Sequence, residues 1–262
     1  MGKWIKDKGE KMKPDDKKTE NKGKKTSGGT KMPLDKIFCD CDVLTDGFYK
    51  DFHDPTAEFY EKEHRAFCYD VSRRLIEEAK NQDPANWHTH EKTINGILLL
   101  LFCWNYRAIK TKGLKRENVI KLLEETKEYL EKLKNERISD FDNLDEWDKE
   151  AIKRLYAKFK ELFGQTGASK ALSLINTELF VMWDSKIRER LKKFPIFRIK
   201  KIDNGKKPEH YLNFLEGMNG IVKEYKLEEK ILKGSSIAKK LDEYNYVEII
   251  MKSKKKVGKG LG

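Results

Sequence analysis

The amino-acid sequence predicts an all-α fold, a multi-helix orthogonal bundle. Apolar residues recur at three- and four-residue intervals over most of residues 56–250, and the period-two alternation typical of half-buried strands is nearly absent. Short connections separate the periodic segments, as they do in helical domains. Thirteen Phe, ten Tyr and five Trp supply large side chains for a core, although 38% of the 262 residues are charged.

The net charge of +12 is concentrated at the two ends of the chain. Residues 1–31 hold eleven lysines against five acidic residues, and residues 252–262 hold five lysines and no acid. Residues 1–31 contain almost no apolar side chains, so we expect a disordered Lys-rich tail there and a second basic tail at 252–262. Residues 32–251 have a net charge near +1 and form the all-α domain, either as one unit or as two helical subdomains.

The first half of this domain contains three predicted helices. Residues 56–80 form a continuous apolar stripe, which predicts one helix with Thr56 as its N-cap. Residues 91–109 are the most apolar stretch, and we expect this helix to be central and buried on most sides. Residues 115–134 form an amphipathic helix.

The second half begins with a helix from about Leu144 to Gly164, since glycine commonly ends a helix. Further apolar stripes predict helices at 167–176, 184–194, 208–227 and, beginning at Ser235 or Ser236, 235–250.

Membrane and secreted proteins are disfavoured by the sequence. The longest apolar run, residues 97–103, is seven residues long, against about 20 for a membrane helix. The N-terminus has no apolar signal core, and the four cysteines lack the spacing of a disulfide framework. We expect a cytoplasmic protein with reduced thiols and no membrane association.

No cofactor or metal site is predicted. The sequence has no Walker loop, dinucleotide fingerprint or nucleophile elbow. Cys39 and Cys41 are separated by one residue, whereas a zinc knuckle has two, and the paired His88 and His90 suit a loop.

The stretch "FGQTGAS" predicts a tight glycine turn between two helices. Gly164 and Gly167 allow a sharp change of direction and leave backbone amides uncovered. Amides at a helix N-terminus bind phosphate, so two helices joined in this way grip the DNA backbone without reading sequence. The phosphate-binding residues predicted here are Gly164, Gln165, Thr166, Gly167, Ser169 and Lys170, with Thr166 or Ser169 capping the second helix.

Asp184 stands between an apolar run, residues 179–183, and a strongly basic segment. Residues 186–201 hold eight Lys or Arg and one Glu, a net charge of +7. Asp184 can be an ordinary N-cap, a functional carboxylate, or both. The basic side chains can bind DNA phosphates or form a solvated helix face; they are Lys186, Arg188, Arg190, Lys192 and Lys193.

The segment "LFGQTGASKALSLINTELFVMWDSKIR" resembles the helix-hairpin-helix DNA glycosylases, the endonuclease III-like enzymes, over about residues 94–193. In that superfamily a glycine hairpin, an apolar helix and a hydrophobic run precede an aspartate at the start of a helix. The resemblance implies that Asp184 is the catalytic carboxylate and that a damaged or mismatched base is flipped from duplex DNA. Thr166 occupies the place of the lyase lysine and no iron–sulfur cysteines follow, so a monofunctional enzyme is favoured over a lyase.

Two other functions remain open. One is a noncatalytic helix-hairpin-helix module that binds DNA, and the other is a helical protein-interaction protein. If the chain is a glycosylase, Asn176 and Glu178 are expected to help shape the pocket, and residues 104–107 lie near the flipped base. Met182 and Trp183 are expected in the core.

Overall fold

The computed structural model describes residue 45 and residues 47–202, 206–231 and 235–252, and within these residues the chain is helical with no strand. The all-α prediction is confirmed. The predicted tails lie outside the described residues, apart from Lys252, and so do Cys39 and Cys41.

The predicted helix at 56–80 is wrong in one respect, because the structure has two helices there. Helix α3 spans Thr56–Lys62 and α4 spans Ala66–Gln82, with Glu63 between them in an extended conformation. The Glu63 carboxylate accepts hydrogen bonds from the backbone N–H and the guanidinium of Arg65. These local bonds compete with helix continuation, which explains the break. Pro55, not Thr56, is the N-cap of α3.

Helix α5 spans Glu91–Lys112 and α6 spans Arg116–Lys132, close to their predicted bounds. The buried residues Ile97, Leu100 and Leu101 confirm that α5 reaches the core. Its opposite face is exposed, however, with Phe102 and Tyr106 in contact with solvent. The helix kinks at Asn105, whose φ is −140°.

Helix α7 spans Glu146–Ile175 and follows a 3₁₀ turn, η1, at Ile138–Asn143 that the sequence analysis missed. Asp145 caps α7 through a capping box with Asp148. The helix changes direction at Gly164, where φ is +76°. The two predicted helices on either side of Gly164 therefore adjoin with no loop between them.

The C-terminal half consists of shorter elements around one long helix. Residues 180–184 have no regular secondary structure and lead into α8 (Ser185–Leu191) and α9 (Pro195–Ile199). Helix α10 spans Pro208–Glu224 and is followed by the 3₁₀ turn η2 (Leu227–Lys230). Helix α11 (Ile237–Asn245) begins at the capping Ser236, as predicted, and continues into the π-helical turn η3 (Tyr246–Met251).

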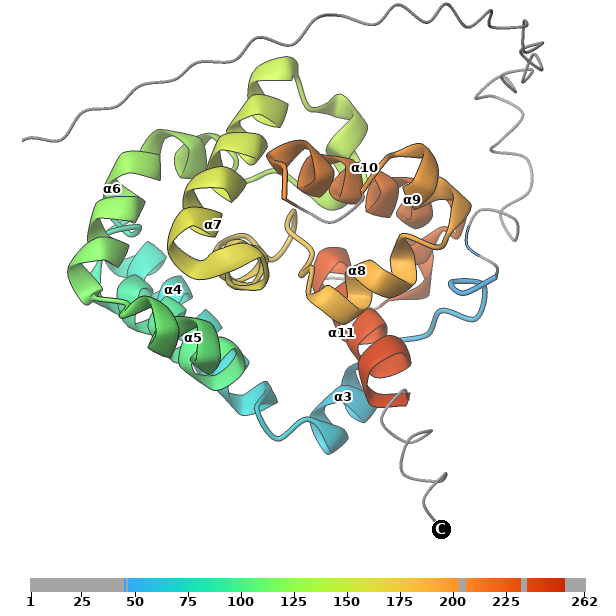
Figure 1. Cartoon of the computed structure of the whole chain (residues 1–262), viewed down its shortest axis with the longest axis horizontal. Coiled ribbons are helices and arrows are strands. Elements are labelled where there is room, and N and C mark those ends of the chain that lie inside the picture. Colours follow the sequence, from blue (N-terminus) through green and yellow to red (C-terminus); the bar gives the residue numbers. More distant parts are fainter. Residues whose placement is uncertain (1–44, 46, 203–205, 232–234, 253–262) are drawn as a thin grey trace, which may run out of the picture.

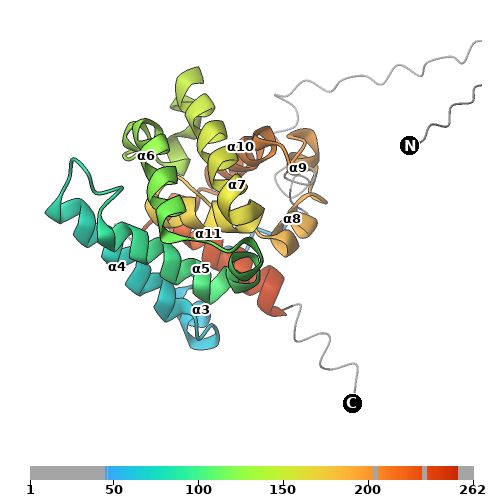
Figure 2. The ribbon, with the colours of Figure 1, turned by 60° about the vertical axis from the view of Figure 1, so that its left-hand side comes forward.

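Helix α7 lies in the middle of this arrangement. Helices α4, α5 and α6 lie on one side of it, and α8 to α11 lie on the other (Figure 1). In the rotated view, α4 and α6 lie on one side of α7 and α8, α9 and α10 lie on the other, with α3 close to α11 (Figure 2). A single cluster of buried side chains runs through both sides. None of the described helices has the length and apolarity needed to span a bilayer.

Candidate active site

The bend of α7 fits against the kink of α5. Asn105 lies at that kink and donates its side-chain N–H to the carbonyl oxygen of Phe163 at 3.2 Å, just before the bend. Gly167 is buried beside it, and a Cβ there would lie 2.6 Å from Asn105 Nδ2 and 2.7 Å from Phe163 Cβ. Glycine is therefore required at these two positions for different reasons. Gly164 has a backbone conformation that favours glycine, and Gly167 has no room for a side chain.

The residues of the predicted glycine turn divide into surface and interior positions. Gly164, Gln165 and Thr166 are partly exposed. Ser169 was predicted to bind phosphate, but its hydroxyl is fully buried and donates to the Thr166 carbonyl at 3.2 Å, so this prediction is corrected. Gly167 is also buried, so it offers no exposed surface for the predicted contact with phosphate.

Three buried side chains make hydrogen bonds to the backbone of the segment just before Asp184. Ser169 Oγ accepts the Trp183 N–H at 2.9 Å, and Tyr211 donates to the Val181 carbonyl at 3.0 Å. The Asp242 carboxylate accepts the Met182 N–H. Met182 and Trp183 are buried, which confirms that they belong to the core. This anchoring fixes where Asp184 emerges.

Asp184 is the N-cap of α8, and its Oδ1 accepts the N–H of Ile187 at 2.9 Å. The N-cap interpretation is therefore confirmed. The side chain is only partly exposed, and it also lines a cavity. A capping carboxylate has further acceptor capacity on its second oxygen, so the cap does not prevent a chemical role.

The cavity beside Asp184 is narrow: its volume is about 20 Å³, which is room for about one water molecule. Seven segments contribute to it, from α3 to η3. The residues that line it are Phe59, Trp104, Lys170, Met182, Asp184, Ile187, Lys239, Asp242 and Tyr246.

Lys170 lines this cavity, and its predicted contact with phosphate stays a prediction. Its ammonium donates to the Trp104 carbonyl at 3.2 Å and lies 5.4 Å from the centre of the Trp104 ring. Burial lowers the pKa of Lys170 to about 8, and the Asp184 carboxylate opposes this shift. A substantial fraction of Lys170 is consequently a neutral amine in mildly alkaline solution.

Aromatic rings form one wall of the cavity. The ring of Trp104 is stacked with those of Tyr69 and Tyr246, each with a centroid distance of 6.3 Å, and Phe59 meets Tyr246 edge-on at 5.6 Å. The indole N–H of Trp104 is buried and has no hydrogen-bond partner among the described residues. Planar groups stack favourably on such a wall.

Glu63, Arg65 and Tyr246 brace the aromatic wall from outside. The Tyr246 hydroxyl donates to Glu63, and Arg65 donates to the Tyr246 oxygen at 2.9 Å and to both Glu63 oxygens. Burial alone would raise the pKa of Glu63, but the hydrogen bonds from Arg65 and Tyr246 lower it to about 2. The link between α3 and α4 is thereby tied to η3.

Three of the five predicted basic residues have interaction partners within the chain. Arg188 donates to the Trp183 carbonyl at 3.3 Å, Arg190 lies 4.9 Å from the Phe194 ring centre, and Lys192 pairs with Glu189 at 2.5 Å. Lys186 and Lys193 are exposed.

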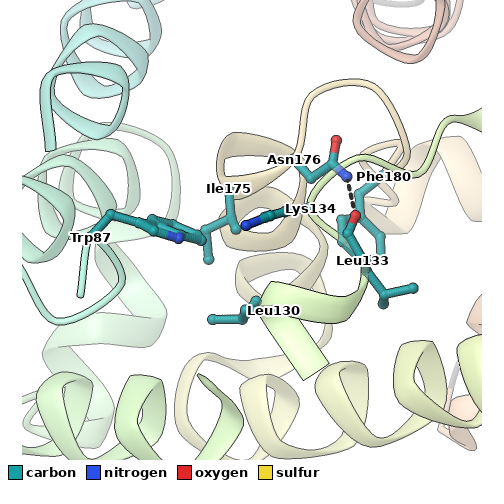
Figure 3. Close-up of a pocket in the computed structure, with 7 residues that line it drawn as sticks. All are labelled: Trp87, Leu130, Leu133, Lys134, Ile175, Asn176 and Phe180. Carbon is teal, nitrogen blue, oxygen red and sulfur yellow. Dashed lines mark hydrogen bonds between the residues drawn. The ribbon is translucent and has the colours of Figure 1, made fainter. Parts of the chain in front are cut away.

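Asn176 has a structural role away from this cavity. Its amide donates to the carbonyls of Leu133 and Glu136 at 2.7 and 3.1 Å, and its oxygen accepts the N–H of Glu178 at 2.9 Å. It lines a separate, smaller cavity with Trp87, as Figure 3 shows. Asn176 and Glu178 are not among the residues lining the Asp184 cavity, so the expectation that they shape that pocket is wrong.

The C-terminal wall of the cavity was missed by sequence reasoning. Lys239 and Asp242 stand one helical turn apart in the segment predicted only as a packing helix, and Tyr246 follows one turn later. The signal in the sequence that could have identified this wall is their i, i+3, i+7 spacing. It places two charges and an aromatic ring on a single helix face. Searches of protein-family models, curated proteins and solved structures gave no match to this chain.

Proposed function

We propose that this protein is a DNA-binding enzyme of the helix-hairpin-helix type that excises a damaged or mismatched base from duplex DNA. The observation that carries the proposal is the cavity that joins the Asp184 carboxylate, the buried amine of Lys170 and a wall of aromatic rings. A concave site with convergent charged groups and a perturbed pKa is typical of an active site. The glycine bend at Gly164 lies on the same helix as Lys170.

Asp184 has the chemistry needed for hydrolysis of an N-glycosidic bond. As the base departs, positive charge develops on the sugar, and a fixed carboxylate nearby stabilises it. Asp184 is held by its cap to Ile187 and by the anchored run before it, so it does not have to reorganise. Water then attacks the sugar to complete a monofunctional reaction.

Buried side chains keep the cavity narrow, and two of them, Phe59 and Ile187, are each 2% exposed. A flipped base therefore enters only if the cavity widens, and α3, which carries Phe59, is a seven-residue helix connected through an extended residue at Glu63. Widening on this side requires the hydrogen bonds that tie the link after α3 to η3 to break.

DNA contacts are assigned to the outer face of the bend and to the exposed lysines. Gly164, Gln165 and Thr166 are partly exposed and supply backbone amides, while Lys186 and Lys193 supply charge near the start and end of α8. Binding through such contacts releases counterions, so affinity falls steeply as salt rises.

The test is base release from duplexes that each carry one damaged or mismatched base, measured for the intact chain and for Asp184→Asn. Asn still caps a helix, so the variant is expected to fold and bind DNA but to lose release. Asp145→Asn is the matched control, because Asp145 caps α7 outside the cavity. Release that survives in Asp184→Asn, or that is lost equally in both variants, contradicts the assignment.

Lys170 raises a further possibility within the same test. If its amine attacks the sugar, the chain forms a covalent imine that borohydride traps, and Lys170→Met abolishes trapping. Absence of trapped complex together with base release identifies the monofunctional reaction.

The second candidate function is a noncatalytic DNA-binding module. It is favoured by the hydrogen bond from the Ile187 N–H to Asp184, because this bond already gives Asp184 a structural role as a helix cap. Salt-dependent binding without release of any base in the panel would select this candidate.

A further inference from the structure

Two thiols on neighbouring helices lie side by side, and the proposed function uses neither of them. Cys68 is in the first turn of α4 and Cys103 is in α5, and both thiols are free and partly exposed. The thiol of Cys103 is hydrogen-bonded to that of Cys68. A disulfide bond needs two sulfurs that can meet without movement of the backbone, and this pair is placed for one.

The packing of α4 against α5 explains why the two thiols meet. Gly96 of α5 lies against Ser72 of α4, because a Cβ on Gly96 would be 2.7 Å from the Ser72 carbonyl oxygen. Two helical turns further along α5, Cys103 meets Cys68, which lies one turn before Ser72, so the two helices run antiparallel. Disulfides join residues whose Cα atoms lie within about 7 Å, and the glycine contact draws the two backbones together close to the thiols.

Each of the two cysteines is followed in the chain by a ring of the aromatic wall. Tyr69 follows Cys68, and Trp104 follows Cys103. The rings of Tyr69 and Trp104 are stacked with a centroid distance of 6.3 Å, and Trp104 lines the Asp184 cavity. A bond between the two sulfurs would hold this end of α4 against α5, so the two rings would stay stacked when the helices move.

The surroundings of the pair indicate which thiol reacts first. Burial, followed by the hydrogen bond with Cys68, raises the pKa of Cys103 to about 11. Cys103 therefore keeps its proton near neutral pH and donates it to the sulfur of Cys68. The thiolate is the attacking form in thiol–disulfide exchange, so we expect Cys68 to attack first and Cys103 to follow.

We propose that Cys68 and Cys103 form a reversible disulfide that locks α4 to α5, with a low-molecular-weight disulfide such as glutathione disulfide as the oxidant. The Cys68 thiolate attacks glutathione disulfide, breaks its S–S bond and releases one glutathione thiolate. Cys103 then loses its proton to water and attacks the Cys68 sulfur of the mixed disulfide, which releases the second glutathione. Two protein thiols are oxidised, and one glutathione disulfide is reduced to two glutathione thiols. This modification site does not depend on the proposed function.

The experiment equilibrates the full chain with mixtures of reduced and oxidised glutathione, once without denaturant and once in concentrated urea. The samples are quenched with acid, the remaining thiols are alkylated, and the chain is digested with trypsin without reduction. A bond between Cys68 and Cys103 links peptide 66–73 to peptide 93–107, whereas Cys39 and Cys41 lie together in peptide 37–50. The ratio of linked to alkylated peptides, measured by mass spectrometry, gives the effective concentration of one thiol toward the other.

The linked peptide is expected in the folded chain, with an effective concentration at least about 30-fold above that in urea. This ratio corresponds to the stabilisation that a disulfide usually gives, because a bond stabilises the folded state by as much as folding favours the bond. Cys103→Ser should accumulate the mixed disulfide at Cys68, since the second thiol is missing. Cys68→Ser is the matched control, and it should form a mixed disulfide at Cys103 more slowly.

An effective concentration that is the same in the folded chain and in urea overturns the inference. So does a digest in which peptide 66–73 or 93–107 is linked to peptide 37–50 instead. Mixed disulfides that form at equal rates in Cys68→Ser and Cys103→Ser overturn the order of attack. Base release is measured on the reduced chain, so none of these results alters the test of the proposed function.

Discussion

Gly167→Ala tests whether the bend of α7 and the kink of α5 are sterically matched. The new Cβ would lie 2.6 Å from Asn105 Nδ2 and 2.7 Å from Phe163 Cβ. The Asn105 amide can shift, but Phe163 Cβ is fixed to the backbone one turn away. Overpacking of this kind costs about 1–3 kcal/mol, and the higher helix propensity of alanine offsets about 1 kcal/mol. A loss near the upper end of the net range, about 1–2 kcal/mol, is expected.

Two other glycine variants separate this steric effect from backbone effects. Gly164→Ala meets no atom within 4 Å, but its φ of +76° and ψ of 172° are strained for alanine, which costs about 1–3 kcal/mol. In Gly220→Ala the Cβ lies 3.2 Å from the flexible end of Ile196, so the free energy of unfolding should change by less than about 1 kcal/mol.

The assay is urea unfolding followed by tryptophan fluorescence, with the midpoint and slope compared across the variants. Combining Gly167→Ala with Asn105→Ala should cost less than the two single changes together, because the second removes one of the two clashing groups. The steric explanation is wrong if Gly167→Ala destabilises no more than Gly220→Ala, or if the double variant is simply additive.

Three further predictions concern buried polar groups around the cavity. The pKa of Lys170 is lowered from 10.5 to about 8, so the protein should gain stability as the pH rises between these values, and Lys170→Met should abolish this gain in urea unfolding; an unchanged pH profile would contradict it. The pKa of Asp242 is raised from 3.8 to about 7, so stability should fall as the pH rises from about 4 to 7, and thermal unfolding of Asp242→Asn should lack this fall. Ser169→Ala leaves the buried Trp183 N–H without its acceptor and should cost about 1–3 kcal/mol in urea unfolding, whereas Ser185→Ala, at an exposed position, should cost less than about 0.5 kcal/mol; equal effects would refute the role of Ser169.

The sequence predicted most of the long helices because their apolar stripes are continuous. Residues 91–109, 115–134 and 208–227 lie within one to three residues of the bounds of α5, α6 and α10. The bend at Gly164 was also predictable, since a glycine there interrupts an apolar stripe. The break between α3 and α4 was not, because it depends on hydrogen bonds from Arg65 to Glu63 rather than on apolar spacing.

The candidate site was only partly predictable for a related reason. Asp184 was identifiable because a carboxylate follows an apolar run and begins a basic helix. The position of Lys170 depends on a tertiary contact, because its ammonium donates to the Trp104 carbonyl next to the kink of α5. Asp242 lies more than fifty residues from Asp184 along the chain, although both line the cavity. Local sequence spacing carries no information about residues that come together over such a distance.

The two hydrogen bonds to the Asp242 carboxylate, from Ser173 and Met182, affect the order in which the parts of the protein fold. Ser173 and Met182 are 69 and 60 residues away from Asp242 in the chain. During synthesis, α7 and the run before Asp184 can therefore leave the ribosome and begin to fold well before α11 exists. Asp184 and Lys170 therefore reach their final arrangement in the cavity only when α11, which lines the same cavity, has been made and has packed against them.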